Sequence, residues 1–470
     1  MLRFSHTVGN DMGVLMFRKI LKQPMEFHFT TTSSEIISNL TKKIHILSLE
    51  IVHPIILVST NIIIITIVVF YLLFSAGVQV LIVFFLLISL FYFFWKLTKS
   101  RLSQNSIIIS KNSDLLVKII SETITAIKLI SMNQIQTIFT TKFGVINKKL
   151  KFAEGDNVFL SQSIRIWLEL VIIILGAVFC FISIRSGVFL EILPILGGLV
   201  FGVYRIIPLV LKAYSGFATI MGARESFKDI LYYLTLNETF PRYNAEIKKL
   251  NFSNKIILHN IYYNYPSKTI PNLKGINCYI EKYKITAILG TTGSGKTTFA
   301  SLLAGLINPS KGKLIIDKRP LNYENIDEWQ SKISFVPQET IIIDGSISDN
   351  IATILNKEVN IEKLKKALKI AKLEKFIPHL DSEEIMGERG IKISGGERQR
   401  IGIARAIYDD KEIIILDEPF SALDKKTGEA ILSNIRKHKK FTILIVTHDK
   451  FVIPFCDNLI TLSDGQIIKQ

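Results

Sequence analysis

The chain has 470 residues, of which 49% are hydrophobic and only 21% are charged, and its formal net charge is +17. This composition excludes an intrinsically disordered chain and argues against a wholly soluble protein. The basic residues are spread over both halves without a basic block. This diffuse positive charge suits an anionic membrane surface or is simply a solvated cationic surface, and it does not predict a nucleic-acid partner.

Residues 1–235 are expected to form an α-helical transmembrane domain. A hydrocarbon core of about 30 Å requires about 20 apolar residues in a helix. Four apolar stretches approach this length with very few charges, which is unusual for the core helices of soluble proteins. We therefore predict four membrane spans, at about 51–74, 77–95, 166–184 and 188–211.

The loop charges predict the orientation of these spans. Lysines and arginines gather in residues 1–50 and 96–165, whereas the two short connections between paired spans carry Arg185 alone. The N-terminus, the central loop and everything after the fourth span should therefore face the cytoplasm. Residues 1–20 lack the apolar region of a cleavable signal peptide.

The second half of the chain has a different pattern. Residues 236–254 are polar and are predicted to form a linker. From 255 to 470, short β-branched runs such as KITAILG, EIIILD and FTILIV alternate with helical patterns. This alternation predicts an α/β domain with buried, mostly parallel strands.

A glycine-rich segment follows one of these predicted strands and matches the P-loop pattern G-x-x-x-x-G-K-[ST] in the required strand–loop–helix context. Its residues, with one further threonine, are Gly290, Thr291, Thr292, Gly293, Ser294, Gly295, Lys296, Thr297 and Thr298. Such glycines let backbone N–H groups point at the phosphates of a nucleotide, and the following helix adds its positive end. Lys296 should reach the β- and γ-phosphates and Thr297 should place a hydroxyl on Mg²⁺. A purely structural glycine turn is the alternative.

Two carboxylates end the hydrophobic run EIIILDEP. They are Asp417 and Glu418, and they should emerge at the carboxyl edge of the sheet, where open α/β folds bind nucleotides. One carboxylate could hold Mg²⁺ through water, and the next could take a proton from an attacking water. Two acids after a strand are common, so this signal gains its weight from the neighbouring P-loop.

A third motif reads ISGGERQR and begins at Ile393. The Ser-Gly-Gly turn of Ser394, Gly395 and Gly396 at the start of a helix offers another set of amides suited to phosphate oxygens.

The three cysteines, Cys180, Cys278 and Cys456, are far apart without C-x-x-C spacing. This argues against a disulfide framework or a zinc site and favours a reducing compartment for the soluble part.

With these motifs in this order, the second half resembles the ATP-binding-cassette (ABC) transporters over its whole length. The resemblance implies that Tyr265 stacks on adenine, with Tyr263 as the competing candidate. It implies that Gln338, in SFVPQE, contacts Mg²⁺ and communicates with the membrane domain. It also implies that His448, in IVTHDK, bonds the γ-phosphate, and that Glu418 is the catalytic carboxylate.

The same resemblance assigns two further loops. Residues 387–390 resemble the loop that precedes the signature in exporters, and Asp424 ends a segment that resembles the D-loop. The signature reads ISGGE where LSGGQ is common, and we expect Glu397 to be tolerated because Ser394 and the glycine amides make the phosphate contacts. One cassette per chain implies a head-to-tail dimer with a second copy or a related half-transporter.

A membrane domain fused ahead of the cassette resembles the exporter arrangement, which has six spans per chain. Four predicted spans imply that the first two are missing, through truncation, a misassigned start or a genuine short form. The membrane half most resembles flippases of lipid-linked oligosaccharides and polysaccharide exporters. Arg205 in the fourth apolar stretch could serve a pyrophosphate-linked substrate, or it could extend to the inner headgroups.

Two cytoplasmic segments resemble the coupling regions of such exporters. One should lie within residues 23–36, and the other within 121–136, which would dock onto the partner chain's cassette. An amphipathic spacing supports an interface helix in the second segment, carried by Ile124, Ile127, Leu129 and Ile130. Packing of this segment within its own bundle is the alternative.

The leading interpretation is an ATP-hydrolysing exporter or flippase half-transporter of the bacterial cytoplasmic membrane, with ATP and Mg²⁺ as cofactors and its cassette in the cytoplasm. Its cargo would be a lipid-linked oligosaccharide, a lipid or a hydrophobic compound. A soluble-type ABC ATPase of DNA repair or translation is a second interpretation, which the predicted spans disfavour. A third is a truncated, non-transporting subunit that needs a complete partner chain.

Overall fold

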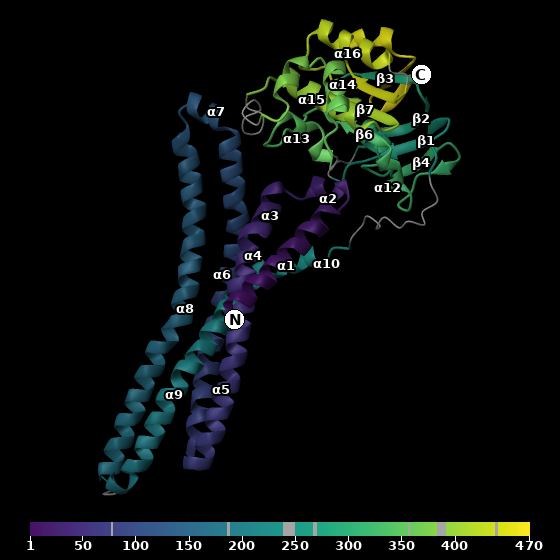
Figure 1. The fold of residues 1–470 in the computed structure, drawn as a ribbon. Coiled ribbons are helices and arrows are strands. Elements are labelled where there is room, and N and C mark those ends of the chain that lie inside the picture. Colours follow the sequence, from purple (N-terminus) through teal and green to yellow (C-terminus); the bar gives the residue numbers. More distant parts are fainter. Residues whose placement is uncertain are drawn as a thin grey trace. The chain divides into compact units, whose positions relative to one another are not determined.

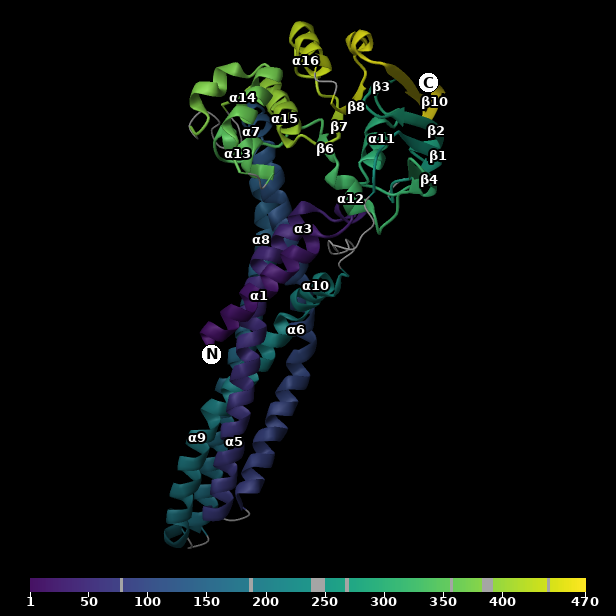
Figure 2. The same ribbon diagram turned by 45° about the vertical axis from the view of Figure 1, so that its right-hand side comes forward.

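The computed structural model describes residues 1–76, 79–185, 189–237, 250–266, 270–355, 358–382, 392–437 and 440–470. The chain divides into two compact units (Figures 1 and 2). The first unit comprises residues 1–23 and 31–238, and the second comprises residues 24–30 and 239–470. The division after residue 238 falls in the predicted linker, most of which lies outside the described residues.

The described secondary structure of the first unit is entirely helical, as the hydrophobic pattern predicts. Two π-helical segments, η1 and η2, interrupt the helix that begins at Ser33, on either side of the short helix α4. The elements are α1 (Leu2–Leu21), α3 (Ser33–Ser38), η1 (Asn39–Lys43), α4 (Ile44–Ile46), η2 (Leu47–Val52), α5 (His53–Ala76), α6 (Gln79–Thr125), α7 (Ile127–Met132), α8 (Gln136–Arg185), α9 (Phe189–Gly222) and α10 (Arg224–Thr235).

Four long helices overlap the four predicted spans and run side by side as a bundle (Figures 1 and 2). They are α5, α6, α8 and α9, and their described core includes the fully buried Leu102, Ile164 and Tyr214. Within the described residues, one segment, Ser33–Tyr71, is long and apolar enough to cross a membrane by length and composition. A bent pair, Ile206–Gly222 and Arg224–Thr235, passes the same test when taken as one span. The predicted helical fold of this half is found, and the count of four spans stays a prediction.

The outer face of α5 is apolar as well as exposed. Ile63, Ile67, Phe70 and Phe74 are all at least 59% exposed. Large apolar side chains gathered on one exposed face are unfavourable in water and favourable against lipid or another apolar surface. This face is what a transmembrane helix requires.

The predicted coupling segment at 121–136 contains α7, between the long helices α6 and α8. Of its four amphipathic residues, Ile130 is buried, and Ile124, Ile127 and Leu129 are more than half exposed. The segment therefore presents three apolar side chains outward from the end of the helical unit. Its docking onto a partner cassette stays a prediction.

A buried lysine joins three elements of the helical unit. Lys43 of η1 is 1% exposed, and its Nζ lies 2.8 Å from Asp229 of α10 and 3.0 Å from Asp114 of α6. Ser110 of α6 also donates a hydrogen bond to Asp229. These bonds fix α10, the helix that precedes the linker, against η1 and α6.

Replacing Lys43 with methionine should lower the free energy of unfolding by about 2 kcal/mol, because two carboxylates lose their shared cation. The loss is smaller than for a fully buried pair, since Asp114 and Asp229 keep 29% and 38% of their side-chain surface exposed. Denaturant melting in detergent measures it. Lys42→Met is the matched control, because the Lys42–Glu154 pair is 35% and 31% exposed and should contribute well under 1 kcal/mol. Equal losses in both variants would contradict the prediction.

The second unit is an α/β domain, which confirms the predicted fold class. Its described strands form a four-stranded antiparallel sheet and a six-stranded, mostly parallel sheet. The first has the order β2 (Leu273–Glu281), β1 (Lys255–Tyr263), β4 (Lys311–Ile316) and β5 (Arg319–Pro320). The second has the order β10 (Gln466–Lys469), β9 (Asn458–Ser463), β3 (Ile285–Gly290), β8 (Thr442–Thr447), β7 (Ile413–Asp417) and β6 (Ile333–Val336).

Helices cover these sheets and complete two apolar cores. One core packs α15 against the parallel strands through residues such as Ile401, Ile414 and Ile445, and the other packs α11 between the two sheets through Phe299 and Ile288. The helices are α2 (Met25–Thr30), α11 (Lys296–Leu303), α12 (Ile326–Ser331), α13 (Ile347–Ile351), α14 (Ile361–Ile370), α15 (Gly395–Asp409) and α16 (Lys425–Lys437), with 3₁₀ turns at Thr353–Leu355, Glu374–His379 and Lys450–Phe455.

The short helix α2 belongs to the second unit although it precedes the bundle in the chain. Met25 packs against the core between the sheets, and the Phe29 ring meets the Tyr265 ring edge-on with 5.3 Å between centroids. The predicted coupling segment at 23–36 therefore includes a helix that packs on the α/β domain.

Candidate functional site

The candidate site lies where three neighbouring parallel strands end. The glycine-rich loop follows β3, Asp417 ends β7 with Glu418 directly after it, and His448 follows β8. Because β7 and β3 both pair with β8 in parallel, their carboxyl ends meet at one edge of the sheet. The sequence predicts that Asp417 and Glu418 emerge at the carboxyl edge of the sheet, and the structure adds the distances between these residues and the loop.

The loop after β3 depends on glycine where the backbone turns into α11. Gly295, the N-cap of α11, has a φ of +100°, in the left-handed region that favours glycine. A Cβ at this position would also lie 2.8 Å from the carbonyl oxygen of Asn272. The loop can therefore pass close to its neighbour and open its amides at the start of α11.

Lys296 is almost completely buried within this loop. It is 7% exposed, and its Nζ donates to the carbonyl oxygens of Gly290 at 2.9 Å and Thr291 at 3.0 Å. The same nitrogen lies 3.7 Å from Oε1 of Glu418. A buried cation in the loop that precedes a helix suits an anionic ligand such as a polyphosphate.

A hydroxyl and a carboxylate with magnesium chemistry meet beside the loop. Thr297 Oγ1 donates to Asp417 Oδ1 at 3.4 Å, and Asp417 is 2% exposed. Burial raises the pKa of Asp417, the charge of Glu418 raises it further, and Thr297 and Lys296 act against this rise. The Ser294 hydroxyl is buried without a hydrogen-bond partner among the described residues. These hard oxygen atoms fit Mg²⁺.

The third predicted magnesium ligand, Gln338, is not brought into this group. It is exposed just after β6, and no hydrogen bond among the described residues joins it to Thr297 or Asp417. Its predicted role requires a movement or a ligand that draws the loop inward, so it stays a prediction.

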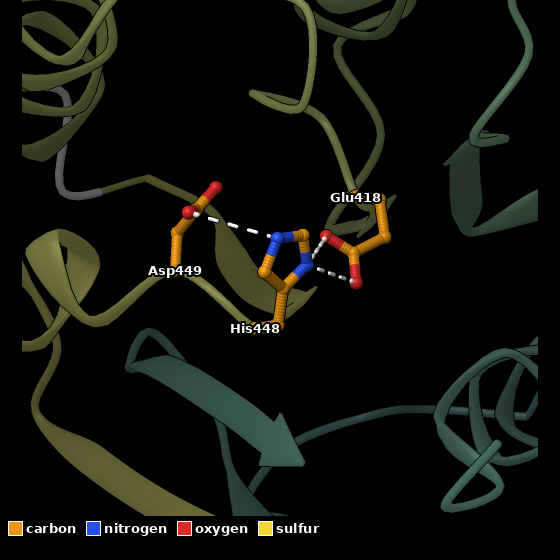
Figure 3. Close-up of side chains that lie close together, drawn as sticks. All are labelled: Glu418, His448 and Asp449. Atoms are coloured by element: carbon orange, nitrogen blue, oxygen red, sulfur yellow. Dashed lines mark hydrogen bonds and ion pairs between the residues drawn. The ribbon is translucent and has the colours of Figure 1, made fainter. Parts of the chain in front are cut away.

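The Glu418 side chain points toward the ring of His448 (Figure 3). The Glu418 backbone has a φ of +45°, which is strained for a residue with a side chain, and its side chain is 10% exposed. Its carboxylate lies 3.0 and 3.1 Å from Nδ1 of His448, and Thr447 Oγ1 donates to it at 3.2 Å. With Lys296 nearby, the carboxylate is held by two basic groups in an orientation from which it can take a proton.

The contact with Glu418 also changes the pKa of His448. The hydrogen bond and charge of Glu418 raise the pKa of His448, with help from Asp449, whereas burial and Lys296 oppose the rise. Nε2 of His448 lies 3.9 Å from Asp449 Oδ1 (Figure 3). The ring is 57% exposed, so the stabilisation is modest.

The raised pKa of His448 predicts a pH-dependent stability. The imidazolium–carboxylate pair is complete below the ordinary histidine pKa of about 6.5 and is lost as the pH rises through the raised value. Without nucleotide or divalent cation, His448→Gln should therefore lower the melting temperature most at acid pH and least at alkaline pH. His379→Gln, at an exposed histidine, is the control. A deficit that is independent of pH would contradict the prediction.

The two candidate tyrosines for adenine stacking differ in exposure. Tyr263 is 3% exposed in the core, whereas Tyr265 is half-buried, with its ring edge-on to Tyr263 at 5.0 Å. The Tyr265 hydroxyl lies 3.4 Å from Thr298 Oγ1 in α11. Tyr265 is thus the tyrosine beside the glycine-rich loop, and Phe29 of α2, which sequence reasoning missed, touches the same ring.

The Ser-Gly-Gly turn begins α15 with Ser394 as N-cap. Glu397 N donates to Ser394 Oγ at 3.2 Å, while Oε2 of Glu397 accepts from Ser394 N at 2.7 Å and from Ser394 Oγ at 2.9 Å. Lys375 donates to the other oxygen, Oε1. Ser394 and Gly395 are exposed, and no hydrogen bond in the described part of the chain joins Ser394, Gly395 or Gly396 to the loop at 290–298.

Gln399, which sequence reasoning missed, connects α15 to the residues after β7. Its Nε2 donates to Ser421 Oγ at 2.6 Å and to the Glu418 carbonyl at 3.3 Å, and its Oε1 accepts from Ala422 N at 3.0 Å. The exposed Asp424 ends this segment, and bonds from Thr427 hold the pKa of Asp424 below its usual range. The repeated polar positions of ERQR gave no signal that would single out Gln399.

The loop at 387–390 and the side chains of Arg205 and Cys180 lie outside the described residues. Cys278 and Cys456 are both free thiols. No contact among the described residues places either thiol in the site.

Two family models match the chain. The model described as "ABC transporter transmembrane region" matches residues 2–190, and the model described as "ABC transporter" matches residues 273–421. The first covers most of the helical unit. The second runs from β2 through the glycine-rich loop and the Ser-Gly-Gly turn to Ser421, so it contains most of the predicted site.

Curated relatives match mainly over part of their length. The chain is 34% identical over 230 residues to an ATP-dependent lipid A-core flippase of Photorhabdus laumondii, covering 48% of this chain and 39% of the flippase. It is 32% identical over 256 residues to the heterocyst differentiation ATP-binding protein HepA of a Nostoc species, covering 54% of this chain and 41% of HepA. The chain thus matches about two-fifths of the length of these relatives.

A solved structure shares the fold over nearly the whole chain. It is a bacterial Atm1-family ABC exporter with ATP bound, superposed with a TM-score of 0.86 over 99% of this chain and 82% of that chain. The sequence identity is 18%, so this likeness speaks for the fold alone.

Proposed function

Because the chain belongs to the ABC transporters, with the transmembrane region and the cassette fused in one polypeptide, we propose that it is an ATP-hydrolysing half-transporter of the exporter or flippase kind. The observation that carries the proposal is the meeting of Lys296, Glu418 and His448 at one edge of the parallel sheet. Phosphoryl transfer to water requires a cation that binds the phosphate and, beside it, a carboxylate held in a fixed position.

Each residue of the site has a proposed role in ATP binding or hydrolysis. The amides of the loop at 290–298 and the Lys296 ammonium bind the phosphates, and Tyr265 stacks on the adenine. Glu418 orients a water molecule and takes its proton, and His448 bonds the γ-phosphate while holding Glu418 in place. Mg²⁺, when bound, would be held by Thr297, Asp417 and an inward-moving Gln338, and would neutralise charge on the phosphates.

The proposed active assembly is a head-to-tail dimer. Ser394 and Gly396 are not bonded to the chain's own phosphate loop within the described residues, and Ser394 is exposed. We propose that they complete the site of a second copy or a related half-transporter, each site combining the loop of one chain with the turn of the other. Asp424 would lie at the same junction.

The proposed cargo is a lipid-linked oligosaccharide, a lipid or a hydrophobic compound in the bacterial cytoplasmic membrane. Support comes from relatives named ATP-dependent lipid A-core flippases and from the exposed apolar face of α5. The helices α2 and α7 would act as the coupling segments between the two halves. Phe29, which touches Tyr265, gives α2 a direct contact with the proposed adenine site.

The test is Mg²⁺-dependent ATP hydrolysis by the purified chain in lipid nanodiscs at several protein concentrations. Specific activity should rise with protein concentration if two copies complete each other's sites, and it should vanish with EDTA. ATP binding without turnover at every concentration would contradict a self-sufficient half-transporter and favour a subunit that needs a different partner. Active preparations would then be tested in vesicles for movement of a fluorescent phospholipid and of a labelled lipid-linked glycan.

A further inference from the structure

We propose that Glu397 and Lys375 are positioning residues that decide whether the Ser394 hydroxyl donates its proton to its own helix or to the nucleotide of the opposing site. The inference rests on the proposed function, in which Ser394 faces the phosphates bound by a partner chain. It concerns the departure from the common signature that places a glutamate at position 397.

The first step concerns the single proton of the Ser394 hydroxyl. Ser394 Oγ lies 2.9 Å from Oε2 of Glu397 and 3.2 Å from the Glu397 amide nitrogen. The amide donates to the hydroxyl oxygen, and a carboxylate can only accept, so the hydroxyl proton points at Glu397. In this state only the lone pairs of the Ser394 hydroxyl face an incoming phosphate oxygen. Those lone pairs repel the phosphate oxygen.

The second step concerns the cost of turning that proton outward. Oε2 of Glu397 also accepts from the Ser394 backbone nitrogen at 2.7 Å, so the helix cap survives when the hydroxyl leaves. What opposes the turn is the negative charge of Glu397, whose side chain is only 12% exposed. The same charge would lie close to the phosphates of the opposing nucleotide.

The third step assigns Lys375 its role. Lys375, in the 3₁₀ turn Glu374–His379, donates to Oε1 of Glu397, on the side away from Ser394. Burial acts to raise the pKa of Glu397, but the bonds from Lys375 and from Ser394 outweigh it and hold the pKa below its usual range. Glu397 is therefore anionic at neutral pH, and Lys375 supplies the compensating charge that weakens its pull on the hydroxyl.

A glutamine at position 397 would not need this compensation. Its amide oxygen can accept from the Ser394 backbone, so the cap is kept, and it brings no negative charge to the phosphates. Lys375 is thus the partner that a glutamate signature requires, and removing the charge of Glu397 should make Lys375 dispensable. This dependence separates a positioning role from simple packing of the 3₁₀ turn.

The experiment measures kcat and KM for ATP in nanodiscs for the unmodified chain, Lys375→Met, Glu397→Gln and the double variant. Lys375→Met should raise KM about fivefold with kcat changed less than about twofold, because a partly exposed pair is lost and the contact binds ground and transition states alike. In the Glu397→Gln background, Lys375→Met should change KM less than about twofold. Lys375→Arg should restore the original KM.

Lys369→Met is the matched control, since Lys369 is an exposed lysine of α14 with no ion pair among the described residues, and it should leave KM unchanged. Melting curves establish that each variant is folded. Equal effects of Lys375→Met in both backgrounds, or no effect in the unmodified background, would overturn the inference while hydrolysis itself persists. An unmodified chain that neither binds nor hydrolyses ATP would overturn the proposed function and the inference with it.

Discussion

Glu418→Gln should reduce ATP hydrolysis about a hundredfold or more while ATP still binds, because the amide cannot take the proton of the attacking water. The substitution preserves the shape of a side chain that is 10% exposed and held by His448 and Thr447. Phosphate release and binding of a fluorescent ATP analogue, measured on the same nanodisc preparation, separate the two effects.

Glu412→Gln is the control for this substitution. Glu412 immediately precedes β7, the strand that ends at Asp417, and its carboxylate pairs with Lys282 and Lys332 away from the site. It should lower stability slightly and leave turnover within about twofold of the original. Substantial hydrolysis by Glu418→Gln would assign the proton acceptor to another residue.

Lys296→Met should weaken ATP binding about a hundredfold, because the charge-assisted bonds of a buried ammonium to the phosphates are lost. Lys296 is 7% exposed and lies between the carbonyl oxygens of the loop and the Glu418 carboxylate. Without it, the carboxylate faces the nucleotide with one cation fewer. Equilibrium binding of the fluorescent analogue measures the loss directly.

Lys284→Met serves as the matched control, because Lys284 is an exposed lysine at the opposite end of β3. It should leave affinity unchanged. If Lys296→Met bound ATP as tightly as the original chain, the amides of the loop alone would account for phosphate binding, and the role proposed for Lys296 would be wrong.

The sequence predicts much of the cassette because its motifs follow buried strands. The runs KITAILG, EIIILD and FTILIV contain the strands β3, β7 and β8, and the motifs that follow them meet because parallel strands share a carboxyl edge. The expectation of mostly parallel strands holds for the six-stranded sheet, whereas β1 and β4 belong to the antiparallel sheet. Strand pairing of that kind depends on partners far away in the chain, which periodicity does not reveal.

Other parts of the site depend on contacts that no local pattern encodes. Phe29 lies in a segment near the N-terminus whose sequence gives no sign that it meets Tyr265. In the sequence, Lys43 is one of several cations among residues 1–50, and only the packing of η1, α6 and α10 buries it between two carboxylates. Glu397 is visible as a departure from the common signature, but its partner Lys375 lies 22 residues earlier.

The hydrogen bonds of Gln399 have a consequence for how two ATP molecules would be used. In the proposed dimer, the start of α15 contacts the phosphates of one nucleotide, while Glu418 of the same chain takes part in hydrolysis of the other nucleotide. Gln399 ties α15 to the Glu418 carbonyl, Ser421 and Ala422, so a shift of α15 displaces the backbone that carries Glu418. Occupancy of one site would thereby alter reactivity at the other, and hydrolysis would show cooperativity in ATP concentration.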